Sequence, residues 1–317
     1  MKIDEYDIIR TITERFPRLP EGYAQIGDDV AVVPSRGGKA VLKCDMLVGK
    51  TDVPRGMSWR QAARKAVAMC VSDFSAKGVR PDSFMVSVGV PRGTRAGQVE
   101  MLAEGFRDAA TEWSLKLVGG DTSEAEGLVV DSVMVGFADR IVRRGTAKKG
   151  EYIVVTGAFG KPSAGLKILQ GGARAEPGFK KRAVSSVLNP EPRLEVGLAL
   201  SEYLSSSIDS SDGLAICLHT ISETSGVGVR VRAPPIAAGI ARFATLNSLS
   251  IEDLVLYGGE EYEIVGTVPK KRFAEARKMA RSAGGDLFVI GETTKAALGI
   301  RLSSGKEIAR KGWVHLA

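Results

Sequence analysis

The chain consists of segments in which hydrophobic and polar positions repeat with two different periods. In residues 3–16, Ile8, Ile9, Ile12 and Phe16 recur at helical spacing on one side, which predicts an amphipathic helix. Other segments alternate, or are continuously apolar over five to nine residues between glycine and polar positions, and these predict strands. Because helices and strands are mixed along the whole chain, the pattern predicts an α/β or α+β fold.

The first half contains several predicted strands and two long predicted helices. The strands lie within residues 25–33, 39–47, 82–90, 115–123 and 127–138, and the helices within 58–78 and 94–113. Ser58 is a candidate N-cap, because its hydroxyl can accept a hydrogen bond from the first turn of the helix. The second helix is expected to bury Val99, Leu102, Phe106 and Trp113. A Gly-Gly-Asp turn is expected at the end of the strand that follows.

A polar, basic stretch at 139–151 is the best candidate for a domain boundary. It predicts two domains, residues 1–140 and 141–317. After it, strands are predicted within 152–157 and 226–235, helices within 163–172 and 192–204, and a Gly-Gly-Glu turn leading into a strand within 257–269. One further helix and two or three strands are expected to close the chain.

The composition is that of a globular protein: 44% of the 317 residues are hydrophobic and 26% are charged. No apolar run approaches the length of a membrane span, and three scattered cysteines predict reduced thiols, so we expect a cytoplasmic protein without membrane contact. The net charge is +7, but the basic clusters are short and aromatic residues make up only 6%. This argues against a nucleic-acid partner and suits a polyanionic small substrate.

Several aspartates share one context, beside glycine or other small residues where strands end or helices turn. They are Asp28, Asp29, Asp45, Asp73, Asp121, Asp209 and Asp212. Any one of them alone would be explained as a turn former, and Asp212 or Ser211 as a helix N-cap. Asp73 is harder to explain this way, because it lies near the C-terminal end of a predicted helix among small apolar residues. A carboxylate there requires a cation.

The residue types favour magnesium over other metals. Only two histidines and no clustered cysteines are present, which argues against a zinc or iron site, whereas Mg²⁺ prefers carboxylates and commonly bridges to phosphates. The Walker loop, the protein-kinase motifs and a complete dinucleotide-binding fingerprint are all absent from the sequence. The residues by themselves therefore indicate Mg²⁺-dependent phosphate chemistry without a standard phosphate loop.

The motifs IGDDVAVV, DMLV, VSDFSAKGVRPDSF, VGGDTS, SSIDSSDGL and YGGEEYEI together resemble thiamine-monophosphate kinase, from the aminoimidazole ribonucleotide synthetase-like superfamily. The resemblance runs from about residue 24 nearly to the end of the chain. It implies a two-domain α/β fold. The N-terminal domain would carry a mixed sheet that pairs with that of a second subunit in a homodimer, and the C-terminal α/β domain would cover the ATP cleft.

The resemblance also implies a set of site residues. Magnesium ligands would be Asp29, Asp45, Asp73, Asp121, Asp209 and Asp212; ATP contacts would be Gly120, Asp121, Arg144 and Ser211; and substrate contacts would be Asp52, Glu260 and Trp313. Asp73, Asp121, Asp212 and Arg144 would carry the catalysis. For Trp313, anchoring of the C-terminal tail to the core is the alternative.

Three positions depart from the family pattern. Lys43 and Cys44 stand where hydroxyl residues are common, and Lys43 could replace one cation. Asp52 stands where a histidine is common.

The implied reaction is phosphorylation of thiamine monophosphate to thiamine diphosphate by direct in-line transfer from Mg·ATP. The alternative is a sister enzyme that activates a carbonyl-type oxygen, of the aminoimidazole ribonucleotide synthetase or hydrogenase-maturation type. A non-catalytic nucleotide-binding regulator is a third interpretation. Since a phosphate monoester is largely a dianion at neutral pH, the kinase would need no general base, and His219 and His315 are expected to be structural or surface residues.

Overall fold

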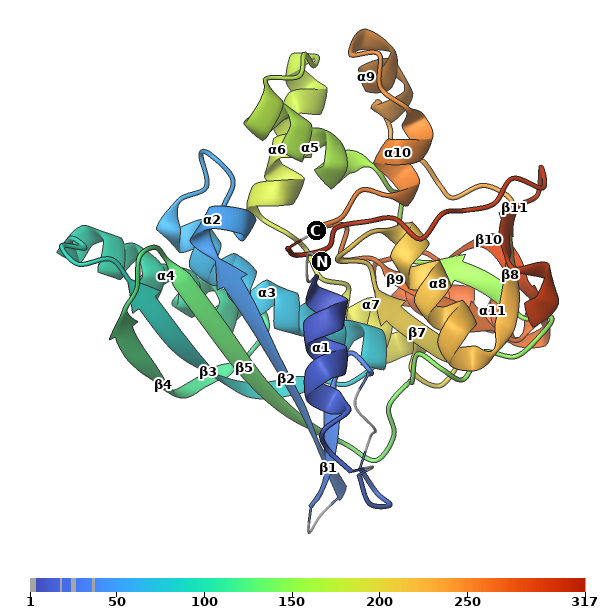
Figure 1. Ribbon diagram of the computed structural model, residues 1–317, viewed down its shortest axis with the longest axis horizontal. Helices are drawn as coiled ribbons and strands as arrows, with labels where there is room; N and C mark the ends of the chain where they lie inside the picture. The colour runs from blue at the N-terminus through green and yellow to red at the C-terminus, as the bar shows by residue number, and fades with distance from the viewer. Residues whose placement is uncertain (1–3, 18, 24–26, 36–37, 317) are drawn as a thin grey trace.

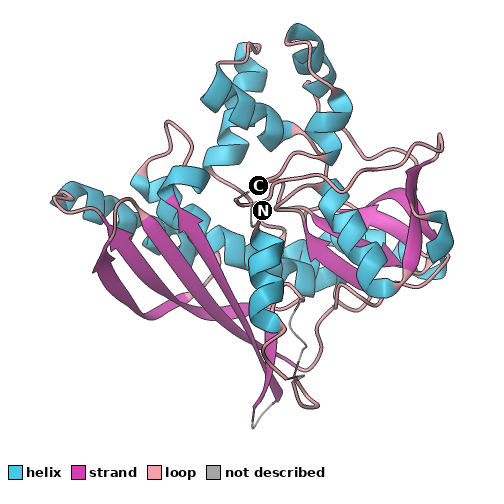
Figure 2. Cartoon of the chain, in the orientation of Figure 1, coloured by secondary structure: helices cyan, strands magenta, loops and turns pink. Residues whose placement is uncertain are grey.

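The computed structural model describes residues 4–17, 19–23, 27–35 and 38–316. It contains two separate β-sheets with helices packed around them (Figures 1 and 2). Ile3, Gln25 and Ile26, at the starts of two predicted elements, lie outside these residues. The mixed α/β fold predicted from the sequence is confirmed. The predicted boundary between residues 140 and 141 stays a prediction, and it would fall between the two sheets.

The first sheet has five strands in the order β1-β2-β5-β3-β4. They are β1 (Ala31–Ser35), β2 (Gly38–Val48), β3 (Pro81–Val90), β4 (Lys116–Glu124) and β5 (Val129–Ala138). Only β3 and β4 pair in parallel, so the sheet is mixed, as predicted. The expected Gly-Gly-Asp turn was wrong: Gly120 and Asp121 continue β4, because β3 supplies hydrogen-bonding partners along its length.

Two long helices cover one face of this sheet, α3 (Trp59–Lys77) and α4 (Ala96–Glu112). Ser58 caps α3 as predicted, in a capping box with Gln61. The two helices approach closely at Gly105, where a Cβ atom would lie 2.1 Å from the backbone oxygen of Arg60.

The other face of the sheet is open. Side chains alternate across it, so that Met134 is buried while Phe137 and Met46 are 63% and 55% exposed. In the described residues no helix packs on this face, whose exposed apolar side chains include Met85.

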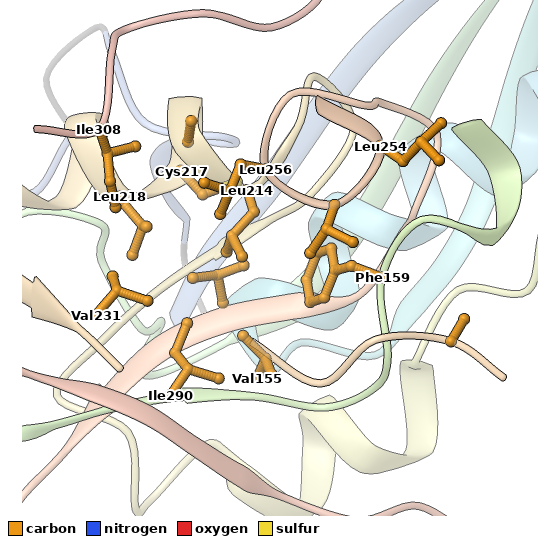
Figure 3. Packing of buried hydrophobic residues seen from close by; sticks show 14 of the residues in the cluster. Val155, Phe159, Leu214, Cys217, Leu218, Val231, Leu254, Leu256, Ile290 and Ile308 are labelled. Atoms are coloured by element: carbon orange, nitrogen blue, oxygen red, sulfur yellow. The ribbon is translucent and has the colours of Figure 1, made fainter. Parts of the chain in front are cut away.

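The second sheet has six strands in the order β11-β8-β10-β6-β9-β7. They are β6 (Tyr152–Val155), β7 (Ser206–Asp209), β8 (Val227–Val231), β9 (Ile264–Val268), β10 (Phe288–Lys295) and β11 (Ile300–Leu302). β9 is buried along its whole length. Figure 3 shows part of the core beside this sheet, in which Val155, Phe159, Leu214 and Ile290 belong to one apolar cluster.

The second half also holds most of the helices. They are α5 (Lys161–Gly171), α6 (Pro177–Leu188), α7 (Leu194–Leu200), α8 (Leu214–Ser225), α9 (Ile240–Leu246), α10 (Ile251–Leu256) and α11 (Phe273–Ser282), with short 3₁₀ turns η1 (Lys270–Arg272) and η2 (Ala296–Leu298). The hydrophobic pattern did not predict α6, α9 and α10, or the single turn α2 (Gly49–Asp52) in the first half. None of the described helices has both the length and the apolar content needed to span a membrane.

The two halves meet along α3. A separate apolar cluster joins Ala76 at the end of α3 to α7, β6, β9 and α11. At this contact a Cβ atom on Gly197 of α7 would lie 1.9 Å from the carbonyl oxygen of Ser75, so only glycine allows this approach.

The N-terminal helix α1 (Glu5–Thr13) forms as predicted, but its apolar side is not buried. Ile9 and Ile12 are 47% and 54% exposed. The start of α1 lies beside the end of the chain, where the Glu5 amide donates to the carbonyl oxygen of His315 (Figure 1). Val99 of α4, predicted to be buried, is also exposed, because it lies on the outer side of the helix.

Candidate active site

A cleft between the two halves collects most of the predicted site residues. Its wall is built from β2, α2, α3, the segments 209–212 and 259–262, and the C-terminal tail. The predicted residues that line it are Asp45, Asp52, Asp73, Asp209, Ser211, Asp212, Glu260 and Trp313. Segments distant in the sequence thus meet at one place.

An acid cluster formed by Asp29, Asp73 and Asp209 lies at one end of the cleft, which Asp73 and Asp209 line. These residues come from the turn before β1, from α3 and from the end of β7, and carboxylate oxygens of all three lie within 4.8 Å of one another. All three are at most 7% exposed. Three buried carboxylates at such distances repel one another, so the cluster suits a hard divalent cation such as Mg²⁺.

Asp73 is the carboxylate whose charged form is strongly disfavoured by burial and by its acidic neighbours. Burial raises the pKa of Asp73 well above its usual value; Lys43 opposes that rise, while Asp209 and Asp45 add to it. The Lys43 ammonium lies 2.9 Å from Oδ2 of Asp73. The sequence argument that a carboxylate here requires a cation is therefore confirmed, and one such cation is a side chain of the protein.

Asp29 is held by two other cations. The Lys77 ammonium lies 2.5 Å from Oδ2 of Asp29 and 2.7 Å from Oδ1 of Asp28, and it also donates to the Ser207 carbonyl oxygen at 2.8 Å. These three acceptors match the three N–H groups of the fully buried Lys77. Arg144 contacts Asp29 from the other side.

Asp209 and Asp212 lie at the junction between β7 and α8. Burial raises the pKa of Asp209 to about 6 and that of Asp212 to about 7, with nearby carboxylates adding to both shifts. The Ser72 hydroxyl donates to Asp209 at 2.8 Å. The N-cap of α8 is Gly213, with no side-chain cap, so the alternative that Asp212 or Ser211 caps this helix was wrong.

The opposite part of the cleft, the glutamate end, is organised around a buried ion pair. Lys65 of α3 is 1% exposed, and its ammonium lies 2.7 Å from Oε2 of Glu260 and 2.9 Å from the Asp52 carbonyl oxygen. The Tyr262 hydroxyl donates to Glu260 at 3.3 Å.

The backbone at the glutamate end is unusual. Glu260 and Tyr262 have φ values of 66° and 52°, left-handed conformations that are uncommon for such residues. The amides of Glu260 and Tyr262 donate to the carbonyl oxygens of Ser211 and Ser210, respectively. These bonds fix the Glu260 side chain toward the cleft.

The C-terminal tail closes this end. Its anchor is a backbone bond, in which the Trp313 amide donates to the Asp212 carbonyl oxygen at 3.0 Å. The indole itself is 49% exposed and lines the cleft beside His315, which it contacts edge-on. An indole this exposed does not fit the alternative in which Trp313 anchors the tail in the core.

Gly120 and Asp121 are not brought to the acid cluster of their own chain. The register aligns Asp121 with Ser87, Asp131 and the exposed Met46, whereas Asp45 shares its row with the buried Ser132. Asp121 therefore lies on the open face of the sheet. It is also three strands away from β2, or about 14 Å at ordinary strand spacing.

The sequence argument missed two functional candidates, Lys65 and Lys77. A signal was present: Lys65, Met69, Asp73 and Lys77 follow one another at four-residue spacing on α3. Ionised residues recurring on one side of a helix that is otherwise built from small apolar residues indicate a buried polar surface.

Comparison with known protein families identifies both halves. The family model for the N-terminal domain of AIR synthase related proteins matches residues 27–138, and that for the C-terminal domain matches residues 148–302.

Among curated proteins, the chain is 34% identical to thiamine-monophosphate kinase of Nitrosopumilus maritimus, over 99% of both chains. It is 32% identical to thiamine-monophosphate kinase of Pyrococcus horikoshii, over 99% of this chain and 97% of that one.

Among solved structures, AaThiL complexed with AMPPCP and TMP is similar, with a TM-score of 0.88, 26% identity and 99% of both chains covered. Hydrogenase maturation protein HypE in complex with ATP shares the fold at 17% identity and a TM-score of 0.71, over 98% of this chain and 96% of that one.

Proposed function

Since the chain belongs to the AIR synthase related proteins and, within them, to the thiamine-monophosphate kinases, we propose that it transfers the γ-phosphoryl group of ATP directly to thiamine monophosphate in a magnesium-dependent reaction. The observation that carries the proposal is the acid cluster of Asp29, Asp73 and Asp209, two of which line the cleft. Such oxygen donors are those that Mg²⁺ shares with nucleotide phosphates.

Magnesium bound here would neutralise charge on the phosphates and on the transferring phosphoryl group. Asp29, Asp73 and Asp209 would hold it, with Asp45 and Asp212 as further ligands on the cleft wall. Ser211, at the exposed edge of the segment before α8, would contact ATP, and Arg144 would assist from its place beside Asp29.

The acceptor needs no general base. A phosphate monoester has its second pKa near about 6, so its nucleophilic oxygen is already free of a proton at neutral pH. His219 contacts the Ile308 carbonyl oxygen, and His315 lines the cleft with its ring edge-on to that of Trp313. We expect His219→Ala and His315→Ala to keep kcat within a few-fold, against the roughly 10²–10⁴-fold loss expected on removing a general base.

The glutamate end would bind the organic part of the acceptor. Glu260 offers a carboxylate to an N–H donor, and the half-exposed Trp313 ring offers a flat apolar surface. The Asp52 carboxylate already accepts a hydrogen bond from the Val48 amide at 2.7 Å. Asp52 would therefore support acceptor binding chiefly through its carbonyl oxygen, which holds Lys65.

Two copies of the chain would form the complete enzyme. The open face of the first sheet presents exposed Met46, Met85 and Phe137, which a second sheet would cover. Asp121 and Gly120 lie on this same sheet, far from their own acid cluster, so they would serve the nucleotide bound by the partner subunit.

Mixing inactive homodimers tests this shared site. Exchange between Asp73→Asn and Asp121→Asn dimers would create heterodimers with one intact site, and activity should return. Continued inactivity of a mixture shown to contain heterodimers would place each site within one chain.

The reaction itself is tested by product analysis. With Mg·ATP and thiamine monophosphate, the kinase should yield ADP and thiamine diphosphate in equal amounts, with little free phosphate. Release of phosphate without thiamine diphosphate would instead indicate an enzyme that activates a carbonyl-type oxygen. Binding of ATP with no turnover would indicate a regulator. A cytoplasmic location stays a prediction.

A further inference from the structure

One lysine lies among the carboxylates that would hold metal ions. Lys43 extends from the middle of β2 into the cleft, and its ammonium lies 2.9 Å from Oδ2 of Asp73 and 3.8 Å from Oδ2 of Asp45. Lys43 and Asp45 point to the same side of the sheet because they are two residues apart on one strand. The ammonium thus lies between a carboxylate of its own strand and one of α3.

The surroundings keep Lys43 charged. Its ammonium faces two carboxylates, Asp73 at 2.9 Å and Asp45 at 3.8 Å, and opposite charges this near favour the charged form. A charged ammonium has three N–H donors and no lone pair, so it cannot ligate a metal ion as a hydroxyl or a carboxylate can. It can only compete with an ion for the same carboxylate oxygen.

Lys77 is a second lysine of the same site, and its three N–H groups are all used by protein acceptors. Its ammonium has three acceptors from two carboxylates and a carbonyl group, and it is fully buried behind Asp29. Lys43 differs on each point: its side chain is 21% exposed, it lines the cleft, and its partners there among the described residues are the carboxylates of Asp73 and Asp45. Its position is that of a cation facing the ligand.

We propose that Lys43 is a resident cation that takes the place of one divalent ion at Asp73. The cleft would therefore bind one divalent ion fewer than it would bind without the Lys43 side chain. This inference rests on the proposed function, because it assumes that the remaining carboxylates bind Mg²⁺.

The test counts ions rather than turnover. Manganese bound per chain is measured by equilibrium dialysis in the presence of AMPPCP, for the full-length protein. Lys43→Met has a side chain of similar length without the charge, and it should bind one Mn²⁺ more than the unmodified protein. Lys43→Arg keeps the charge and should bind the same number as the unmodified protein.

A matched control lies on the same strand. Lys39 is on β2 but donates to the Asp139 carbonyl oxygen at the surface, so Lys39→Met should leave the count unchanged. If circular dichroism shows that Lys43→Met is unfolded, Lys43→Thr takes its place, and its hydroxyl should ligate the additional ion.

The outcomes separate the two proposals. Equal, non-zero counts in the unmodified protein and in a folded Lys43 variant without the charge would overturn the role of Lys43 and leave the metal site standing. No bound Mn²⁺ in the unmodified protein would instead overturn the metal site in the proposed function.

Discussion

The two ends of the cleft balance charge in opposite ways. At the glutamate end, Lys65 is matched to Glu260; Lys65 also donates to the Asp52 carbonyl oxygen, and Glu260 accepts from the Tyr262 hydroxyl. Around the acid cluster, the described residues bring together six carboxylates, Asp28, Asp29, Asp45, Asp73, Asp209 and Asp212, against Lys43, Lys77 and Arg144. The charges at the glutamate end are balanced without a ligand. The acid cluster has an excess of carboxylates, so added positive charge would stabilise it.

The largest effect should come from neutralising the unbalanced end. Asp73→Asn should lower kcat by orders of magnitude, because metal stabilisation of the transferring phosphoryl contributes several kcal/mol. Without Mg²⁺ the same variant should be at least as stable as the unmodified protein, since a costly buried charge is removed. Steady-state kinetics and thermal melting in EDTA measure the two effects.

Asp82→Asn, at an exposed ion pair on β3, is the control. An active Asp73→Asn enzyme at ordinary Mg²⁺ would refute the role of Asp73.

Breaking the balanced end should have the opposite effect on stability. Lys65→Met leaves Glu260 without its buried partner and should cost about 3 kcal/mol of unfolding free energy, measured with urea. The double variant Lys65→Met/Glu260→Gln should recover much of that loss. Arg60→Met breaks exposed ion pairs on the same helix and should cost less than about 1 kcal/mol. If Lys65→Met costs no more than Arg60→Met, the ion pair does not organise this end.

The unbalanced end should also make the metal-free protein sensitive to pH. The pKa values of Asp209 and Asp212 are raised to about 6 and about 7, so the folded state binds more protons than the unfolded state above pH 4. In EDTA, the unfolding free energy should therefore fall between pH 5 and pH 8, by about 4 kcal/mol. Saturating Mg²⁺ should flatten this slope. A metal-free protein that gains stability from pH 5 to pH 8 would contradict the raised pKa values.

The smallest effect should come from the exposed ring at the glutamate end. Trp313→Ala should raise KM for thiamine monophosphate several-fold while KM for ATP changes little, because an aromatic contact contributes about 1 kcal/mol. Initial rates with each substrate varied in turn measure both constants. Equal increases in both, or a loss of stability alone, would assign Trp313 a structural role.

Helices and strands could be predicted from the sequence more accurately than the contacts between them. The Ser58 cap, the helix that contains Asp73 and most strands of the first sheet were predictable, because capping and hydrophobic period act locally. The pairing of Lys65 with Glu260 was not, since 195 residues separate the two and only the packed structure brings them together.

The failures have identifiable physical causes. Gly120 and Asp121 have the composition of a turn, yet pairing with β3 extends the strand through them. The apolar side of α1 predicted a helix correctly, but periodicity does not say what covers that side. The shared context of the aspartates indicated a magnesium site, and the family resemblance assigned them as its ligands. The positions of the cations that neutralise them required the structure.

The attachment of α3 to both halves has a consequence for how ligands enter and leave. Its side chains bond to the second half of the chain at three points: Ser72 to Asp209, Lys77 to the Ser207 carbonyl oxygen and Lys65 to Glu260. A hinge motion that parted the two halves would have to break these buried bonds together. We therefore expect ligands to enter and leave through local movement at the edge of the cleft. The tail that carries Trp313 lies there and is anchored through its backbone. The rate of product release would then depend on that tail more than on any rotation of one domain against the other.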